Sequence, residues 1–376
     1  MAHTLQDRYS DLVLAKLRKE LVLADGFVFN NDYEGDPKAG AVKVPTRDTE
    51  VTVADYNKAS GVSTTTGSTS YTTITINKDK AVNEVIDGYD AEGVPDNLVA
   101  DRLDSAGYAL AAQVDSDGAA ALIADGTAVN VATLTKDNIY KTIVDIRTAM
   151  SKANVPNDGK RFLLVTPDTF ALILTSPEFI AASDLGDDVK QYGILGKIAG
   201  FLVKEWNDST ANLAMIAGHP RFATRVMEWS VPVHVQDLNS SGAFIGACAV
   251  QGRNVYAHKV LRATAIRPVY SPASLALTTA VGTSTAGDTK VTATVITAGD
   301  TLAYKKNPDT TCAYGTASSA YDGTSSAYDG TSMTSGTAKV ISSCSVGDII
   351  EVVEFNSDSK AVAVGYVTLT AADIKA

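Results

Sequence analysis

Residues that could catalyse a reaction or hold a metal ion are few in this sequence. They are His3, His219, His234, His258, Cys248, Cys312 and Cys344. No two histidines stand at the short spacing typical of a metal-binding pair, and no Gly-x-Ser-x-Gly nucleophile elbow occurs. Three cysteines are too few for a disulfide framework, and an odd number cannot all pair within the chain. The cysteine content therefore favours a reducing compartment. We therefore predict no catalytic residue, no metal ion and no cofactor, and we predict that the protein is not an enzyme.

Two short stretches come closest to known ligand-binding motifs. Residues 193–198 contain Gly-Lys, but Gln191 stands where a phosphate-binding loop needs its first glycine, and Ile198 where it needs Ser or Thr. Residues 115–118 read Asp-Ser-Asp-Gly, like half of a calcium loop, but the acids required at the first and twelfth positions are missing. We expect a plain loop at the first stretch and a solvated helix end or turn at the second.

Composition excludes several partners. The chain has 376 residues, a net charge of -11 and 45% hydrophobic residues, which suits two or three folded domains. The acidic balance opposes sequence-independent binding to nucleic acid or to anionic lipid. No apolar stretch reaches the roughly 18 residues of a membrane-spanning helix, and the charged first twenty residues predict no signal peptide.

The N-terminal part of the sequence predicts segments that extend away from the folded domains. Leu14, Leu17 and Leu21 recur at helical spacing, which predicts a first helix over residues 10–24, capped by Ser10. Residues 41–87 alternate in polarity, which predicts two strands joined by an uncharged Ser/Thr-rich tip at residues 60–70. That tip is either a floppy loop or the end of a protruding hairpin that only a neighbouring subunit covers.

The middle of the chain reads as helices and buried strands. A long helix is predicted from Asn97 to about Ala124, opened by Pro95 and Asp96. Its narrow stripe of small residues indicates that something flat, most simply a sheet, packs closely on it, and Gly118 is a weak point. A helix over residues 135–153, a buried strand over 161–165 and two short proline-started helices predict a compact α/β module over residues 129–229, followed by strands to residue 270.

The C-terminal part changes character after Pro268 and Pro272, where we place a stiff linker and a domain boundary. Beyond it, turn signals recur every 8–12 residues or so, which predicts a small β-sandwich, most like an immunoglobulin-like domain although its disulfide and buried tryptophan are missing. A seven-residue duplication at 319–332 is predicted to be an exposed loop.

Several short sequence stretches, and the order of the predicted elements, resemble a known protein family over residues 1 to about 270. They are Leu12–Leu21, Arg161–Pro167, Gly196–Phe201 and Lys259–Arg262. The family is the major capsid proteins of tailed bacteriophages, with the Hong Kong 97-type fold. The resemblance implies an α+β fold with an N-terminal arm at 1–40, an extended loop at 41–90, a peripheral domain with a spine helix at 91–128 and 230–270, and an axial domain at 129–229. Residues 273–376 would be an immunoglobulin-like addition.

The function implied by the resemblance is structural. The chain would self-assemble through hexamers and pentamers into an icosahedral head that encloses double-stranded DNA without sequence-specific contacts. A separate scaffolding protein and a portal would be partners, no membrane would be involved, and the chain would reside in the virion after assembly in the host cytoplasm. Two alternatives stay open: a shell subunit of an encapsulin-like bacterial compartment, and a surface or adhesion protein with an immunoglobulin-like domain.

Subunit contacts are expected on the arm, the hairpin and the start of the long helix. The candidate residues are Leu14, Leu17, Leu21, Val62, Thr65, Thr66, Ser68, Tyr71, Lys78, Asp101 and Arg102.

Overall fold

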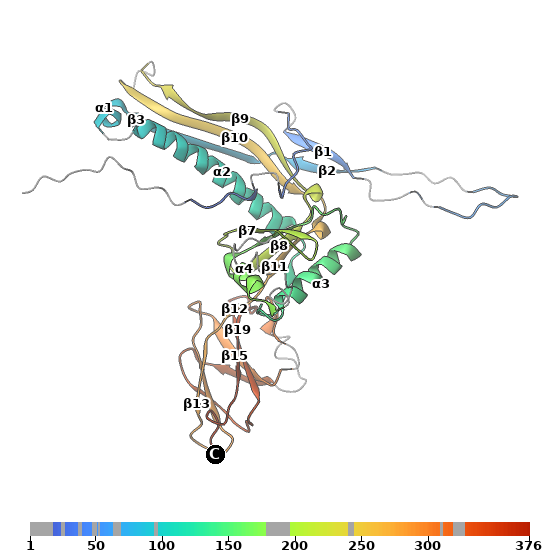
Figure 1. Ribbon diagram of the computed structural model, residues 1–376, viewed down its shortest axis with the longest axis vertical. Coiled ribbons are helices and arrows are strands. Elements are labelled where there is room, and N and C mark those ends of the chain that lie inside the picture. Colours follow the sequence, from blue (N-terminus) through green and yellow to red (C-terminus); the bar gives the residue numbers. More distant parts are fainter. Residues whose placement is uncertain are drawn as a thin grey trace, which may run out of the picture. The chain divides into compact units, whose positions relative to one another are not determined.

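The computed structural model describes residues 18–23, 27–36, 40–46, 51, 53–62, 69–93, 97–177, 196–239, 244–308, 311–318 and 328–376. The chain divides into two compact units (Figure 1). Unit 1 consists of Met1–Gly126 and His219–Ile266, and unit 2 of Thr127–Gly218 and Arg267–Ala376. Both contain strands and helices or short 3-10 turns, so the mixed α/β character predicted from the sequence is confirmed.

Unit 1 is built on a three-stranded antiparallel sheet with β10 (Ala247–Val260) between β3 (Lys78–Asp87) and β9 (Ala223–Asp237). Helix α2 (Leu98–Asp125) runs along one face of this sheet (Figure 1). The Asn97 side chain caps the helix by accepting a hydrogen bond from the Ala100 N–H at 3.3 Å. The long helix and the flat partner predicted from its stripe are both confirmed.

Small residues set the spacing of this layer. The buried stripe of α2 contains Ala106, Leu110, Val114, Gly118, Ala119 and Leu122. A Cβ atom at Gly118 would lie 2.9 Å from Phe29 Cε2, and one at Gly252 of β10 would lie 2.9 Å from Leu110 Cδ1. Gly118 was predicted to be a weak point of the helix, but the helix runs through it because the missing side chain makes room for the Phe29 ring.

A second, smaller sheet in unit 1 pairs β1 (Ala41–Thr46) with β2 (Ser70–Thr75). Val44 and Ile74 pack on Val226 and Ala257 of the larger sheet. The predicted hairpin strands are therefore confirmed at their base, while the residues 47–50, 52 and 63–68 lie outside the described part of the chain. The short helix α1 (Gly88–Gly93) follows β3 directly.

The predicted first helix lies partly outside the described residues, at positions 10–17 and 24. Residues 18–22, which are described, are not helical, so the prediction is wrong there. The reason is that backbone groups of residues 19 and 23 bond to side chains of α2. The Lys19 carbonyl accepts the Tyr108 hydroxyl at 3.0 Å, and the Leu23 N–H donates to Asp115 Oδ1 at 2.7 Å.

Unit 2 begins with a mixed six-stranded sheet in the order β4-β11-β8-β5-β7-β6. Its elements are β4 (Val129–Asn130), α3 (Ile139–Lys152), β5 (Phe162–Val165), α4 (Pro167–Leu174), β6 (Lys197–Ile198), β7 (Phe201–Glu205), β8 (Leu213–Gly218) and β11 (Ile266–Tyr270). Strand β5 is buried throughout, and α3 buries Ile139, Ile143, Ile146 and Met150. The helix was predicted from the periodic spacing of its apolar residues, and the strand from a continuous apolar run. Short 3-10 turns at Pro220–Phe222 and Ala263–Ala265 complete the central part of the chain.

The rest of unit 2 contains two β-sheets with the orders β12-β19-β18-β15-β16 and β13-β14-β17. The strands are β12 (Ala273–Ser274), β13 (Leu277–Val281), β14 (Thr289–Ala293), β15 (Thr301–Lys306), β16 (Tyr328–Met333), β17 (Lys339–Ile341), β18 (Ile349–Phe355) and β19 (Ala361–Thr368). Val291 of one sheet and Leu302 and Val352 of the other share one hydrophobic core. We call this part the C-terminal β domain.

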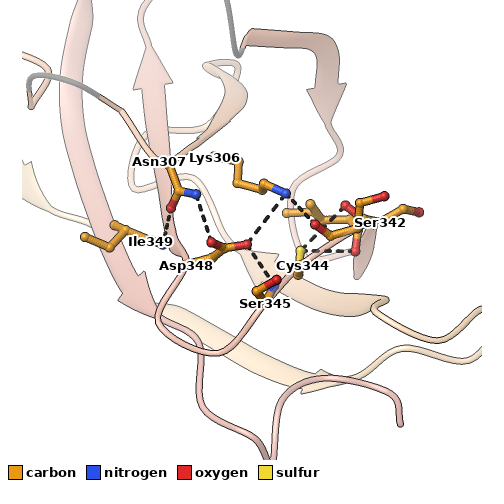
Figure 2. Close-up of polar contacts among 9 residues, drawn as sticks. Lys306, Asn307, Ser342, Cys344, Ser345, Asp348 and Ile349 are labelled. Atoms are coloured by element: carbon orange, nitrogen blue, oxygen red, sulfur yellow. Dashed lines mark hydrogen bonds and ion pairs between the residues drawn. The ribbon is translucent and has the colours of Figure 1, made fainter.

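Polar side chains fasten the loops of this domain to its strands (Figure 2). Asp348 accepts hydrogen bonds from the Asn307 amide at 2.9 Å and from the Ser345 N–H at 2.8 Å, and the Lys306 ammonium lies 3.6 Å away. These contacts, of which the Asn307 hydrogen bond has the largest effect, hold the pKa of Asp348 below its usual value.

The seven-residue duplication at 319–332 is described only from residue 328 onward. The described part of its second copy belongs to strand β16, so the predicted loop is wrong there.

Candidate assembly surfaces

The half calcium motif lies in the middle of α2, not at a solvated helix end or turn as predicted. Asp115 is buried and holds the Leu23 N–H. Asp117 accepts the Tyr256 hydroxyl at 2.8 Å and pairs with Lys78 Nζ at 3.2 Å. Burial alone would raise the pKa of Asp117, but the hydrogen bonds from Tyr256, Gln113 and Lys78 together outweigh it and lower the pKa. The two acids therefore hold flanking segments onto the helix.

The three described histidines have structural contacts. His219 Nδ1 accepts the Arg221 N–H at 3.2 Å, and His234 Nδ1 lies 3.0 Å from the Pro232 carbonyl. His258 packs 4.8 Å from the Phe29 ring, centroid to centroid. Among the described residues, no three His, Cys, Asp or Glu side chains gather as a metal site, and no helix there is long and apolar enough to cross a membrane.

The hairpin region of unit 1 exposes large apolar side chains to solvent. We call Val51, Val53, Tyr56, Val62 and Tyr71 the hairpin surface. Val53 is 94% exposed and Tyr56 74%. Val62 and Tyr71 were predicted as contact residues, but Val51 and Val53 were assigned to a strand. Strand β1 ends at Thr46, before either of them.

A second exposed group lies around α1. We call Tyr89, Phe244 and Ile245, with the acids Asp87, Asp90 and Glu92, the tip surface. Tyr89 is 87% exposed and Ile245 91%. A Cβ atom at Gly88 would lie 2.1 Å from the Gly246 carbonyl oxygen, so the start of α1 touches the β9–β10 connection. Figure 1 shows α1 and the β1–β2 pair at opposite ends of the sheet. No pattern in the sequence pointed to this surface, because it joins residues about 155 positions apart that no local spacing relates.

The remaining predicted contact residues are scattered. Leu14, Leu17, Thr65, Thr66 and Ser68 lie outside the described residues. Leu21 and Asp101 are half-buried. Lys78 pairs with Asp117, and Arg102 binds Glu84 through two hydrogen bonds of 2.8 Å, so both cations tie β3 to α2 within the chain. The contact roles of these residues stay predictions.

A pocket of about 410 Å³ lies at the base of the β1–β2 pair. Its residues are Asp32, Tyr33, Val44, Pro45, Thr46, Thr72, Arg221, Phe222, Leu261 and Arg262. The Arg262 guanidinium lies over the Phe222 ring at 5.7 Å from its centroid. We call this the basal pocket; it combines aromatic and aliphatic walls with two cations, Arg221 and Arg262, and one acid, Asp32.

The predicted stiff linker is wrong at residues 267–270, because they belong to strand β11 of the six-stranded sheet. The C-terminal β domain is joined to the α/β part of unit 2 by a further segment as well. We call residues 311–318 the strap; Ala313 of this segment pairs with Ala132, after β4. The Tyr314 N–H donates to the Val131 carbonyl at 3.0 Å, and the Tyr314 ring stacks on Tyr270 at 5.3 Å. The Gly315 N–H returns to the Ala361 carbonyl of β19 at 2.8 Å. The strap thus bonds to both parts.

Comparisons with known proteins find similarity to phage proteins, including capsid proteins. A family described as phage capsid protein matches residues 89–269, from α1 to β11. A chain of Mycobacterium phage Che8 is similar with a TM-score of 0.60 and 23% identity, over 70% of this chain and 96% of that chain. No curated protein matches the chain.

Two further solved structures are similar. One is from the capsid of the cyanophage P-SCSP1u, with a TM-score of 0.60 and 14% identity over 71% of this chain and 92% of that one. The other is from the mature capsid of bacteriophage PhiM1, with a TM-score of 0.58 and 13% identity over 71% and 92%. These likenesses confirm the predicted fold for the greater part of the chain.

Proposed function

We propose that this chain, the major capsid subunit of a tailed phage, builds its shell by burying the hairpin surface against neighbouring copies. Its structural, non-enzymatic role rests on the family match over residues 89–269 together with the shared fold. The proposal on contacts goes further, and the exposure of the hairpin surface carries it.

The energetic argument is simple. Fully burying a large apolar side chain stabilises by roughly 1.5–3 kcal/mol. Val51, Val53 and Tyr56 are 83%, 94% and 74% exposed in the single chain, so each has most of that free energy still to gain. Association costs several kcal/mol per contact. A few such side chains per contact, repeated over every subunit of a closed shell, are sufficient to offset it.

We also propose the finer domain roles. Residues 1–40 act as the arm, 41–90 as the extended loop, 91–128 with 230–270 as the peripheral domain and 129–229 as the axial domain of hexamers and pentamers. The sheet and helix α2 of unit 1 and the six-stranded sheet of unit 2 support this division. The C-terminal β domain lies beyond the family match, and its two sheets with a common core support an immunoglobulin-like addition.

The proposed partners follow from charge and from the family. The shell encloses double-stranded DNA without sequence-specific contacts, and the net charge of -11 supports a wall that does not condense it. A separate scaffolding protein and a portal take part in assembly in the host cytoplasm, before the chain resides in the virion.

The test compares strongly exposed side chains in the two units. We expect Val53→Ser combined with Tyr56→Ser to leave thermal unfolding unchanged but to lower the yield of closed particles at least about tenfold. Val346→Ser, at a position 66% exposed in unit 2, is the matched control and should assemble normally. Negative-stain microscopy and sedimentation measure the yield.

Normal particles from the hairpin variant would overturn the proposed contact. Particles isolated from the host that contain protein cargo and no DNA would instead indicate the encapsulin-like alternative.

A further inference from the structure

We propose that the tip surface of one copy docks in the basal pocket of a second copy, with Tyr89 as the anchor and Asp90 facing the pocket's arginines. This inference rests on the proposed shell function, which brings many copies into contact. It names a contact distinct from the hairpin surface.

The basal pocket has the chemistry to receive an aromatic residue followed by an acid. Tyr33 and Phe222 provide aromatic walls, and Val44, Pro45 and Leu261 aliphatic ones. Its volume of about 410 Å³ is enough for a tyrosine ring together with a carboxylate. Arg221 is exposed and makes no ion pair within the described residues. An arginine in such a place pairs readily with a carboxylate from outside.

The tip surface has the matching chemistry. Tyr89 is 87% exposed, and its N–H donates to Asp87 Oδ1 at 2.8 Å, which fixes the start of α1. Asp90 and Glu92 are exposed on the same short helix. A large aromatic side chain held outward on an ordered turn is a typical interface anchor, because it loses little entropy on burial.

Position and charge select a second copy as the occupant. The pocket contains residues of β1 and β2, at the end of the sheet opposite α1 (Figure 1), so a tip cannot reach the pocket of its own copy. Two tips cannot face each other without bringing Asp87, Asp90 and Glu92 against their like. A contact between two different surfaces continues from copy to copy, as a shell requires.

Disulfide trapping tests the contact directly. Glu92→Cys combined with Asp32→Cys places thiols on the tip and on the rim of the pocket while keeping Tyr89 and Asp90. Oxidised particles should then give a ladder of linked subunits on a non-reducing gel, and each single variant should not. Absence of the ladder in assembled particles overturns the inference. A ladder from Asp55→Cys with Asp32→Cys in its place also overturns it, because the occupant would then be the hairpin, where Tyr56 follows Asp55.

Charge exchange is the second test. Asp90→Arg and Arg221→Asp should each lower particle yield at least about tenfold, and the double variant should recover most of the loss. Asp358→Arg, on an exposed turn of the C-terminal β domain, is the control and should assemble normally. Normal assembly of Asp90→Arg, with unfolding unchanged, contradicts the docking. Failure of the unchanged chain to form particles even with its scaffolding partner would contradict the proposed function instead.

Discussion

The two units differ in where they keep their large apolar side chains. Among the described residues, those exposed by 61% or more in unit 1 are Val51, Val53, Tyr56, Tyr71, Tyr89 and Ile245, whereas unit 2 has Val346 alone. Unit 2 instead buries its apolar residues in the six-stranded sheet and in the core of the C-terminal β domain. The difference supports the proposal that unit 1 gains further burial by association, whereas unit 2 buries most of its apolar residues within the single chain.

The partners of acidic side chains give a second contrast between the units. In unit 1, Asp117 has the Lys78 ammonium and the Tyr256 hydroxyl as partners. In unit 2, Glu351 is fully buried and receives the Cys312 N–H of the strap at 2.8 Å, with no ion pair to a cation of the described residues. Acid and truncation should therefore act differently on the two units.

The largest expected effect is the removal of the C-terminal β domain. A chain ending at residue 272 lacks the strap, so the segment after β4 loses the Tyr314 hydrogen bond and Tyr270 loses its stacking partner. We expect the α/β part of unit 2 to lose about 3 kcal/mol or more of stability, from the lost bond, the stacking and the newly exposed apolar area. Urea unfolding followed by hydrogen exchange of residues 129–218 measures it. Unchanged protection there would show that unit 2 does not fold as one body.

Acid should weaken unit 1 through His258. Burial, aided by Arg225 and Lys78 and opposed by Asp117, lowers its pKa from 6.5 to about 4. The unfolded chain binds this proton below about pH 6.5 and the folded chain does not, so stability falls as the pH drops from about 6.5 to 4, by about 3 kcal/mol in all. The groups near the ring include Phe29 and Tyr256, at 4.8 and 5.5 Å between centroids.

The measurement is the difference in unfolding free energy between the unchanged chain and His258→Gln across that range. The difference should shift in favour of the variant as the pH falls. A constant difference from pH 7 to pH 4 would show that this ring does not sense acid.

A smaller effect is expected from a single methyl group on α2. Gly118→Ala should destabilise by about 2 kcal/mol, because its Cβ would press on the Phe29 ring. Gly107→Ala is the matched control, since nothing lies within 4 Å of its added Cβ, and it should stabilise by about 0.5–1 kcal/mol through helix propensity. Thermal unfolding of both variants checks the sign. Equal effects would mean that α2 is not held close to Phe29.

The smallest expected effect concerns the buried carboxyl group of Glu351 in unit 2. Burial raises the pKa of Glu351, against the hydrogen bond from Cys312 and the charge of Lys305. A carboxyl group with a raised folded pKa stabilises the fold at low pH and loses that contribution as the pH rises through the folded pKa. Glu351→Gln should therefore stabilise the chain by about 1 kcal/mol at pH 8 and have no effect at pH 4. Chemical denaturation at both pH values decides it, and a loss at pH 8 would indicate that the charge itself is needed.

Local patterns in the sequence were sufficient to predict many of the elements and the kind of fold. The apolar spacing of Ile139, Ile143, Ile146 and Met150 predicted α3, and the continuous apolar run at 161–165 predicted β5, because both patterns depend only on neighbours along the chain. The small-residue stripe of α2 even predicted its sheet. The order of these elements was enough to indicate the tailed-phage capsid fold, which the comparisons confirm.

Contacts between residues distant in the chain determined the features that local sequence patterns did not predict. Residues 18–22 carry a helical pattern but bond to α2, and Asp115 and Asp117 look solvated in sequence but are held by Leu23 and Tyr256. The strap, the basal pocket and the tip surface each join residues distant in the chain. No local spacing encodes such a meeting, because burial and hydrogen-bond partners are set by how the strands align in space.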